Sequence, residues 1–219
     1  ASDLSTIDNR IEAVQKVLNE KYNNQERISV YVKQLDTDRV AAINDEKSMY
    51  AASVAKLGVL YYAQERLSQK KLSLSDEYQY TSAVNGFPGA YDPDGSGKIS
   101  KMPDDKNYSL ENLLKAVAQN SDNVATNILG YYVTNQYDKA FQKSVDKAAA
   151  TSWNMDKKEL TARAAGTLME AVYRQNGDII NYLSSTDYDG ERISKNIDVP
   201  VAHKIGDAYD FKHDVAIVY

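Results

Sequence analysis

Cysteine is absent from the 219-residue sequence, and histidine occurs only twice, at His203 and His213. Without thiols the chain has no disulfide bond, no thiolate metal site and no cysteine nucleophile. Residues 92–99 imitate the start of a calcium loop, but its twelfth position is Pro103, where the motif needs Glu, and this favours a tight hairpin. Surface or core roles are commoner than coordination for isolated histidines, so we expect no metal and no cofactor.

A long apolar run is also missing. The longest apolar stretch lies around residues 54–63 and is interrupted by Lys56 and Gly58, so we expect no transmembrane segment in this chain. Positive charge is not in excess, because 26 Lys and Arg face 31 Asp and Glu and the net charge is −5. Nucleic acid and anionic membranes are therefore poor partners, and a small molecule or a polymer is the expected substrate. No signal-peptide pattern opens the sequence, so composition leaves the compartment open.

The spacing of apolar residues predicts helices and strands in an uneven order. An amphipathic helix is predicted near the start from a 3-4-3-4 spacing of Leu4, Ile7, Ile11, Val14 and Leu18. Alternating residues in 27–35 and 39–44 predict a β-hairpin that turns at 36–38. Strand character then returns only at 199–205 and 213–219, after a middle section of mostly helical pattern.

Strands at both ends with helices between them favour an α+β fold in one domain, residues 1–219. We expect an antiparallel sheet with flanking helices, built from residues 1–52 and 199–219. Residues 53–198 would form a mostly helical lobe, with a cleft between the lobe and the sheet.

The pattern Ser-x-x-Lys begins at Ser53, Ser68 and Ser144. Only Ser53 opens an apolar helical stretch, where the positive end of the helix dipole would stabilise a developing negative charge. Lys56 lies one turn later and points to the same place. Because burying an unpaired ammonium is costly, a chemical role explains Lys56 better than packing does. The alternative is a helix cap followed by a lysine that reaches solvent.

Two more motifs follow, Ser121-Asp122-Asn123 and Lys204-Ile205-Gly206. Each has a plain alternative, a helix-capping turn for the first and a strand end for the second. Taken in order, the three motifs resemble those of the penicillin-recognising serine hydrolases, the class A β-lactamases and low-molecular-weight penicillin-binding proteins. Similar segments at 95–99 and 123–129, and the order of the elements, extend the resemblance over nearly the whole chain. It implies a β-lactamase/transpeptidase-like fold.

The resemblance also implies roles for single residues. Ser53 would form an acyl-enzyme, with Lys56 as its base and the cation of Lys204 lowering the pKa of that base. Ser121 would relay a proton to the leaving nitrogen. The oxyanion hole would consist of the backbone N–H groups of Ser53 and Asp207.

Substrate binding is the part of the site where this sequence departs from the family. Asn123 would hold Lys56 and the substrate amide, while Ile205 replaces the usual Thr or Ser beside Gly206. Anchoring of a substrate carboxylate would then fall to Lys204, Ser121 and residues such as Lys212 or His213. Tyr91 and Tyr108 are candidates for the cleft wall.

A second departure concerns hydrolysis of the acyl-enzyme. Class A β-lactamases carry a Glu between the second and third motifs, and Glu159 is the only nearby candidate here, in a segment that reads as a helix N-terminus. We therefore expect acylation by β-lactams or D-Ala-D-Ala-type cell-wall peptides with slow deacylation. The alternative is a catalytically silent domain that binds a cell-wall ligand or a partner protein.

The third departure is at the end of the chain. In the family a further strand and a final helix follow the strand at 213–219, and that strand fills the middle of the sheet. The chain thus looks cut short, with two strand edges that a complementing C-terminal fragment or a second chain would cover. The family's cell-wall substrates imply a location outside the cytoplasm.

Overall fold

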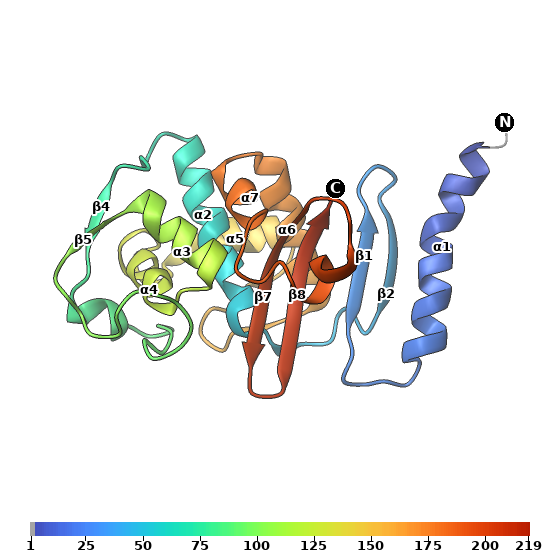
Figure 1. The fold of residues 1–219 in the computed structure, drawn as a ribbon, viewed down its shortest axis with the longest axis horizontal. Coiled ribbons are helices and arrows are strands. Elements are labelled where there is room, and N and C mark those ends of the chain that lie inside the picture. Colours follow the sequence, from blue (N-terminus) through green and yellow to red (C-terminus); the bar gives the residue numbers. More distant parts are fainter. Residues whose placement is uncertain (1–2) are drawn as a thin grey trace.

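A computed structural model describes residues 3–219, with side chains from residue 9 onward. Figure 1 shows strands from both chain ends beside a lobe of helices, as predicted for an α+β fold. The elements near the two ends are α1 (Asp3–Tyr22), β1 (Val30–Gln34), β2 (Arg39–Ile43), β7 (Val201–Ala208) and β8 (Phe211–Val218). The helices between them are α2 (Leu57–Ser68), α3 (Leu110–Asn120), α4 (Asn123–Tyr132), α5 (Lys139–Ala149), α6 (Ala162–Gln175) and α7 (Asp178–Leu183).

The N-terminal helix and hairpin pack together. Strands β1 and β2 are antiparallel, and α1 packs on β2. Ile11 and Leu18 are buried there against Ala41, as the apolar spacing predicted. The side chains of Leu4 and Ile7 lie outside the described residues.

The strands from the two chain ends form two separate hairpins. Among the strands that the structure describes, β1 pairs with β2 and β7 pairs with β8, but β1 and β8 do not pair. Helix α6 contacts β1 of one hairpin and β8 of the other, so it connects the two hairpins (Figure 1). Gly166 of α6 faces the ring of Tyr31, so β1 lies close to the helix backbone. The unpaired edges agree with the expectation, and a segment that would cover them stays a prediction.

The middle of the chain is less purely helical than predicted. Two small antiparallel sheets lie in it, formed by β3 (Met49–Tyr50) with β6 (Glu159–Leu160) and by β4 (Glu77–Gln79) with β5 (Asn107–Ser109). The apolar faces of α2 to α7 share one core, and no helix in the described part of the chain is both long enough and apolar enough to cross a bilayer.

Residues 150–161, between α5 and α6, form a loop that includes the short strand β6. Trp153 anchors this loop, because its ring is fully buried and its indole N–H donates to the carbonyl of Ala55 at 3.1 Å. The prediction of a helix N-terminus at Glu159 is wrong, because Glu159 is exposed on β6 opposite Tyr50.

Trp153 also restricts the residue at position 58. A Cβ atom placed on Gly58 would lie 2.6 Å from Nε1 of Trp153, closer than atoms can pack. We predict that Gly58→Ala lowers the free energy of unfolding by about 1–3 kcal/mol through overpacking, although alanine favours helix by about 1 kcal/mol.

Urea unfolding of this variant and of Gly190→Ala provides the measurement. Nothing lies within 4 Å of a Cβ on Gly190, so its substitution controls for the change of residue type. Equal stabilities of the two variants would contradict the packing assigned to Trp153.

Candidate active site

Ser53 lies in the 3-10 helix η1 (Ala52–Lys56), which leads directly into α2. The sequence predicted an α-helix starting at Ser53, but that helix starts at Leu57. Ser53 itself is half-buried. The preceding Ala52 has a left-handed φ of 50°, which costs a non-glycine residue about 1–2 kcal/mol. Strain of this kind is common at functional sites because the surrounding structure enforces it.

Strand β7 passes η1 backbone to backbone at Gly206. A Cβ on Gly206 would lie 2.5 Å from the carbonyl oxygen of Ala51 and 3.1 Å from the nitrogen of Val54. Only glycine fits this approach, which runs beside the segment that carries Ala52 and Ser53. Asp207 follows directly on the strand. The structure therefore brings the two segments that carry the predicted oxyanion donors, Ser53 and Asp207, into contact, and the role of these donors stays a prediction.

Lys56 is fully buried at the end of η1. Its ammonium donates to the carbonyl oxygen of Ser121 at 2.7 Å, to Oδ1 of Asn123 at 2.5 Å and to the hydroxyl of Ser121 at 3.3 Å. It also lies 4.7 Å from the ring centroid of Tyr91. The predicted contact between Asn123 and Lys56 is present, and Tyr91 does line the site.

Lys204 approaches the same hydroxyl from β7. Only 2% of the residue is exposed, and its ammonium donates to Oγ of Ser121 at 2.9 Å and to the carbonyl of Ile205 at 2.9 Å. The hydroxyl of Ser121 thus contacts both amines. A group in this position can pass a proton between Lys56 and a substrate atom.

A short turn between α3 and α4 presents Ser121. The residue ends α3 with a left-handed φ of 53°, and Asp122 then caps α4 by accepting from the nitrogen of Ala125 at 2.8 Å. The other carboxylate oxygen of Asp122 accepts from the backbone N–H groups of Lys98 and Ile99. The motif is therefore a capping turn and a site element at once.

The loop at 92–97 packs against the turn at 121–123. The amide nitrogen of Asn123 donates to the carbonyl of Asp92 at 2.9 Å. A Cβ on Gly95 would collide with the side chain of Asn123, and one on Gly97 with that of Asp122. The glycines of this segment are required by the close approach, and they fix Asn123 in the orientation that receives Lys56.

Burial governs the charge state of both amines. Desolvation holds the pKa of Lys56 well below its ordinary value, the charge of Lys204 lowers it further, and Asp122 opposes the shift. Desolvation likewise lowers the pKa of Lys204 to about 7, against the opposing charge of Asp214 and with a smaller contribution from Arg192. A neutral lysine amine is a base, so the site contains a candidate general base at neutral pH.

Two of the predicted substrate-binding residues lie outside this cluster. Lys204 and Gly206 face η1, so strand alternation places Ile205 on the other face of β7. Lys212 is exposed on β8 opposite Asp207 and shares that other face. The substrate-binding roles predicted for Asn123, Ile205, Gly206 and Lys212 stay predictions.

The histidines take part in protein contacts. His203 is buried, with its ring nitrogens 3.0 Å from a carboxylate oxygen of Asp214 and 2.9 Å from one of Asp189. His213 donates to the carbonyl of Tyr50 at 2.6 Å. Within the described residues, no group of three His, Asp or Glu side chains is arranged to hold a metal ion.

Lys158 is a buried residue of the site that the sequence did not reveal. It is 7% exposed, and its ammonium lies 4.4 Å from the ring centroid of Tyr91, the ring that Lys56 also contacts. In the sequence, Lys157-Lys158 looks like a solvent-exposed charge run in a short helix connection. The left-handed φ of 55° at Lys158, which turns the chain there, has no sequence pattern that predicts it.

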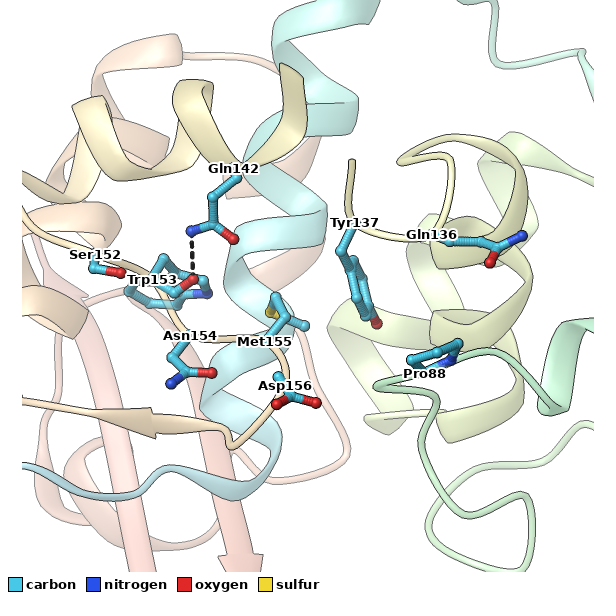
Figure 2. Close-up of a pocket in the computed structure, with 9 residues that line it drawn as sticks. All are labelled: Pro88, Gln136, Tyr137, Gln142, Ser152, Trp153, Asn154, Met155 and Asp156. Carbon is cyan, nitrogen blue, oxygen red and sulfur yellow. Dashed lines mark hydrogen bonds between the residues drawn. The ribbon is translucent and has the colours of Figure 1, made fainter. Parts of the chain in front are cut away.

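A pocket of about 420 Å³ is lined in part by residues 152–156 of the same loop (Figure 2). Its lining comes from the loop, from α5 and from two turns: Pro88, Gln136, Tyr137, Gln142, Ser152, Trp153, Asn154, Met155 and Asp156. Ser53, Lys56, Ser121 and Lys204 do not line it, so it is separate from the lysine cluster.

A sequence model described as the β-lactamase enzyme family matches residues 9–219. The chain belongs to this family. Solved structures agree in fold: PBP-A has a TM-score of 0.70 and 14% identity over 93% of this chain and 85% of its own. A β-lactamase from Sphaerobacter thermophilus DSM 20745 has a TM-score of 0.72 and 15% identity over 94% of this chain and 81% of its own. Penicillin binding protein 6B from Escherichia coli has a TM-score of 0.62 and 14% identity over 83% of this chain and 67% of its own. No curated protein matches the chain in sequence.

The depressed pKa of Lys204 predicts a pH-dependent stability. The unfolded chain protonates this lysine at about pH 10.4 and the folded chain at about pH 7, so between these values the unfolded state binds more protons. Stability therefore rises with pH across this window, by about 1.4 kcal/mol per pH unit for one such group.

Urea unfolding at several pH values across this window tests the effect in Lys204→Met. The variant should lack the increase of stability with pH that Lys204 causes. Its stability relative to the parent protein should therefore increase as the pH falls towards 7. Lys212→Met, at an exposed position of the same hairpin, should follow the parent protein. A parallel pH dependence in Lys204→Met would show that Lys204 titrates normally.

Proposed function

We propose that the protein is a serine hydrolase that forms an acyl-enzyme at Ser53 with β-lactams or with D-Ala-D-Ala-type cell-wall peptides. The observation that carries this proposal is the contact of one hydroxyl, that of Ser121, with two buried amines beside the turn that holds Ser53. Burying two lysines this completely costs stability, which a structural role does not require.

Acylation would proceed by transfer of the Ser53 proton to the neutral amine of Lys56 as Oγ attacks the substrate carbonyl. The backbone N–H groups of Ser53 and Asp207 would stabilise the oxyanion. Ser121 would pass the proton from Lys56 to the leaving nitrogen, and Lys204 would hold the hydroxyl in position. Fold relatives support this chemistry, since one structure of a PBP-A variant is described as an acyl-enzyme complex with penicillin G.

Slow hydrolysis of the acyl-enzyme is the second part of the proposal. Glu159 is exposed on β6. Among the described acidic groups, Asp122 and Asp214 are the ones that act on the two amines, and both are hydrogen-bonded elsewhere. Neither Asp122 nor Asp214 is a free carboxylate that could activate water, and Glu159 is exposed on β6, which supports a penicillin-binding function over rapid β-lactam destruction.

A binding domain without catalysis is the second candidate function. Ile205 favours it, because an isoleucine supplies no hydroxyl for a substrate carboxylate where the family usually has one. Such a domain would bind a cell-wall ligand or a partner protein. Either function fits a location outside the cytoplasm, and a complementing fragment or second chain at the unpaired strand edges would fit both.

Intact-protein mass spectrometry after exposure to penicillin G distinguishes the two candidates. The catalytic proposal predicts one covalent adduct, its loss in Ser53→Ala, and its survival in Ser68→Ala, a change in an exposed Ser-x-x-Lys pattern. The adduct should persist after free penicillin is removed.

Two outcomes would contradict the proposal in different ways. If the adduct is lost as soon as free penicillin is removed, deacylation is fast, and this result would rule out the slow step and indicate a β-lactamase. If neither penicillin G nor activated esters form an adduct in a folded protein, only the binding domain remains.

A further inference from the structure

Lys158 is held in place by contacts that stabilise its charge. Its ammonium donates to the carbonyl of Gly89 at 2.9 Å and to the carbonyl of Met155 at 3.0 Å, and it faces the ring of Tyr91. Carbonyl oxygens and the face of an aromatic ring both attract a cation. The side chain therefore joins the loop at 150–161 to the segment before Tyr91 through a positive charge.

Tyr91 connects this charge to the catalytic amine. The nitrogens of Lys56 and Lys158 lie 4.7 Å and 4.4 Å from the centroid of the same ring, so their separation cannot exceed the sum of these distances. Asn127 fixes Tyr91 by two hydrogen bonds to its backbone, at 2.7 and 2.8 Å, and the phenol donates to the carbonyl of Ala52. Only 7% of Tyr91 is exposed, so little water screens the two charges from one another.

We propose that Lys158 is a positioning residue of the acylation site: its fixed ammonium, on the same tyrosine ring as Lys56, repels a second positive charge and favours the neutral amine of Lys56. The inference rests on the proposed function, in which that amine is the base. It assigns a role to a lysine that lies outside all three sequence motifs.

The charged groups around Lys56 make this role distinct. Lys204 on β7 acts in the same direction as Lys158, while Asp122 at the start of α4 acts in the opposite direction. Lys204 loses its own proton near neutral pH, because burial lowers its pKa to about 7. Burial also lowers the pKa of Lys158, but Asp156 counteracts this shift and the two carbonyls hold the ammonium. Lys158 is thus a second cation beside Lys56, and it is held by two carbonyls where Lys204 faces one hydroxyl and one carbonyl.

The test compares neutral and charged replacements of Lys158. Lys158→Met removes the charge, Lys158→Gln removes it but keeps hydrogen-bond donors for the two carbonyls, and Lys158→Arg keeps the charge. Lys157→Met, at the exposed neighbouring position, is the matched control. Two quantities are measured against pH: the rate of penicillin G acylation, and the 13C NMR shift of Cε of Lys56, assigned by its loss in Lys56→Arg.

Both neutral variants should shift the acid limb of the acylation rate and the titration midpoint of Lys56 to higher pH by about one unit. At a pH below the midpoint, acylation should slow by about tenfold. Lys158→Arg and Lys157→Met should keep the profile of the parent protein. A rate that falls equally at every pH would overturn the inference, because it would show an anchor for the loop and no effect on the base.

Failure of the inference and failure of the proposed function give different results. If the parent protein is never acylated, the proposed function is wrong, and the NMR midpoint of Lys56 still decides the effect of Lys158. If acylation occurs but neither measured profile moves in the neutral variants, the inference is wrong and the function stands. If both neutral variants unfold while Lys158→Arg folds, Lys158 is a structural ion and the inference is also wrong.

Discussion

Burial of the Lys56 side chain is the constraint on which the rest of the site depends. Water would keep this amine protonated, and a protonated lysine cannot accept the proton of a serine. The fold excludes water with the core beneath α2, and it supplies the carbonyl of Ser121 and the amide of Asn123 as the polar partners that a buried amine needs. Burial costs stability because it destabilises the ammonium form. In the proposed function the same effect lowers the pKa of the amine and makes it a base at neutral pH.

Separate parts of the chain meet at that amine, and each does so for a local reason. The turn at Ser121 is set by a left-handed residue and the cap at Asp122, and β7 can approach η1 because residue 206 is glycine. The loop anchored by Trp153 brings Lys158 to the ring of Tyr91. Since these elements are distant in sequence, the site forms only when the helical lobe and the C-terminal hairpin have packed together.

Much of this arrangement could be predicted from the sequence, because short motifs carry local geometry. The order of helices and strands followed from apolar spacing, and the three motifs identified the amines and hydroxyl that the structure brings together. Lys158 could not be predicted, since its burial depends on a loop conformation set by the tertiary contacts of Trp153. The prediction of a helix N-terminus at Glu159 was wrong for the same reason. Tertiary pairing with Tyr50 places this residue on a short strand.

Neutron diffraction from crystals kept at slightly alkaline pH tests the central claim most directly, because it locates the deuterons on each lysine nitrogen. The account predicts two deuterons on Nζ of Lys56, directed at the oxygens of Ser121 and Asn123, while exposed lysines carry three. Three deuterons on Lys56 under these conditions would contradict it, because the amine would then be a structural cation and no base would remain beside Ser53.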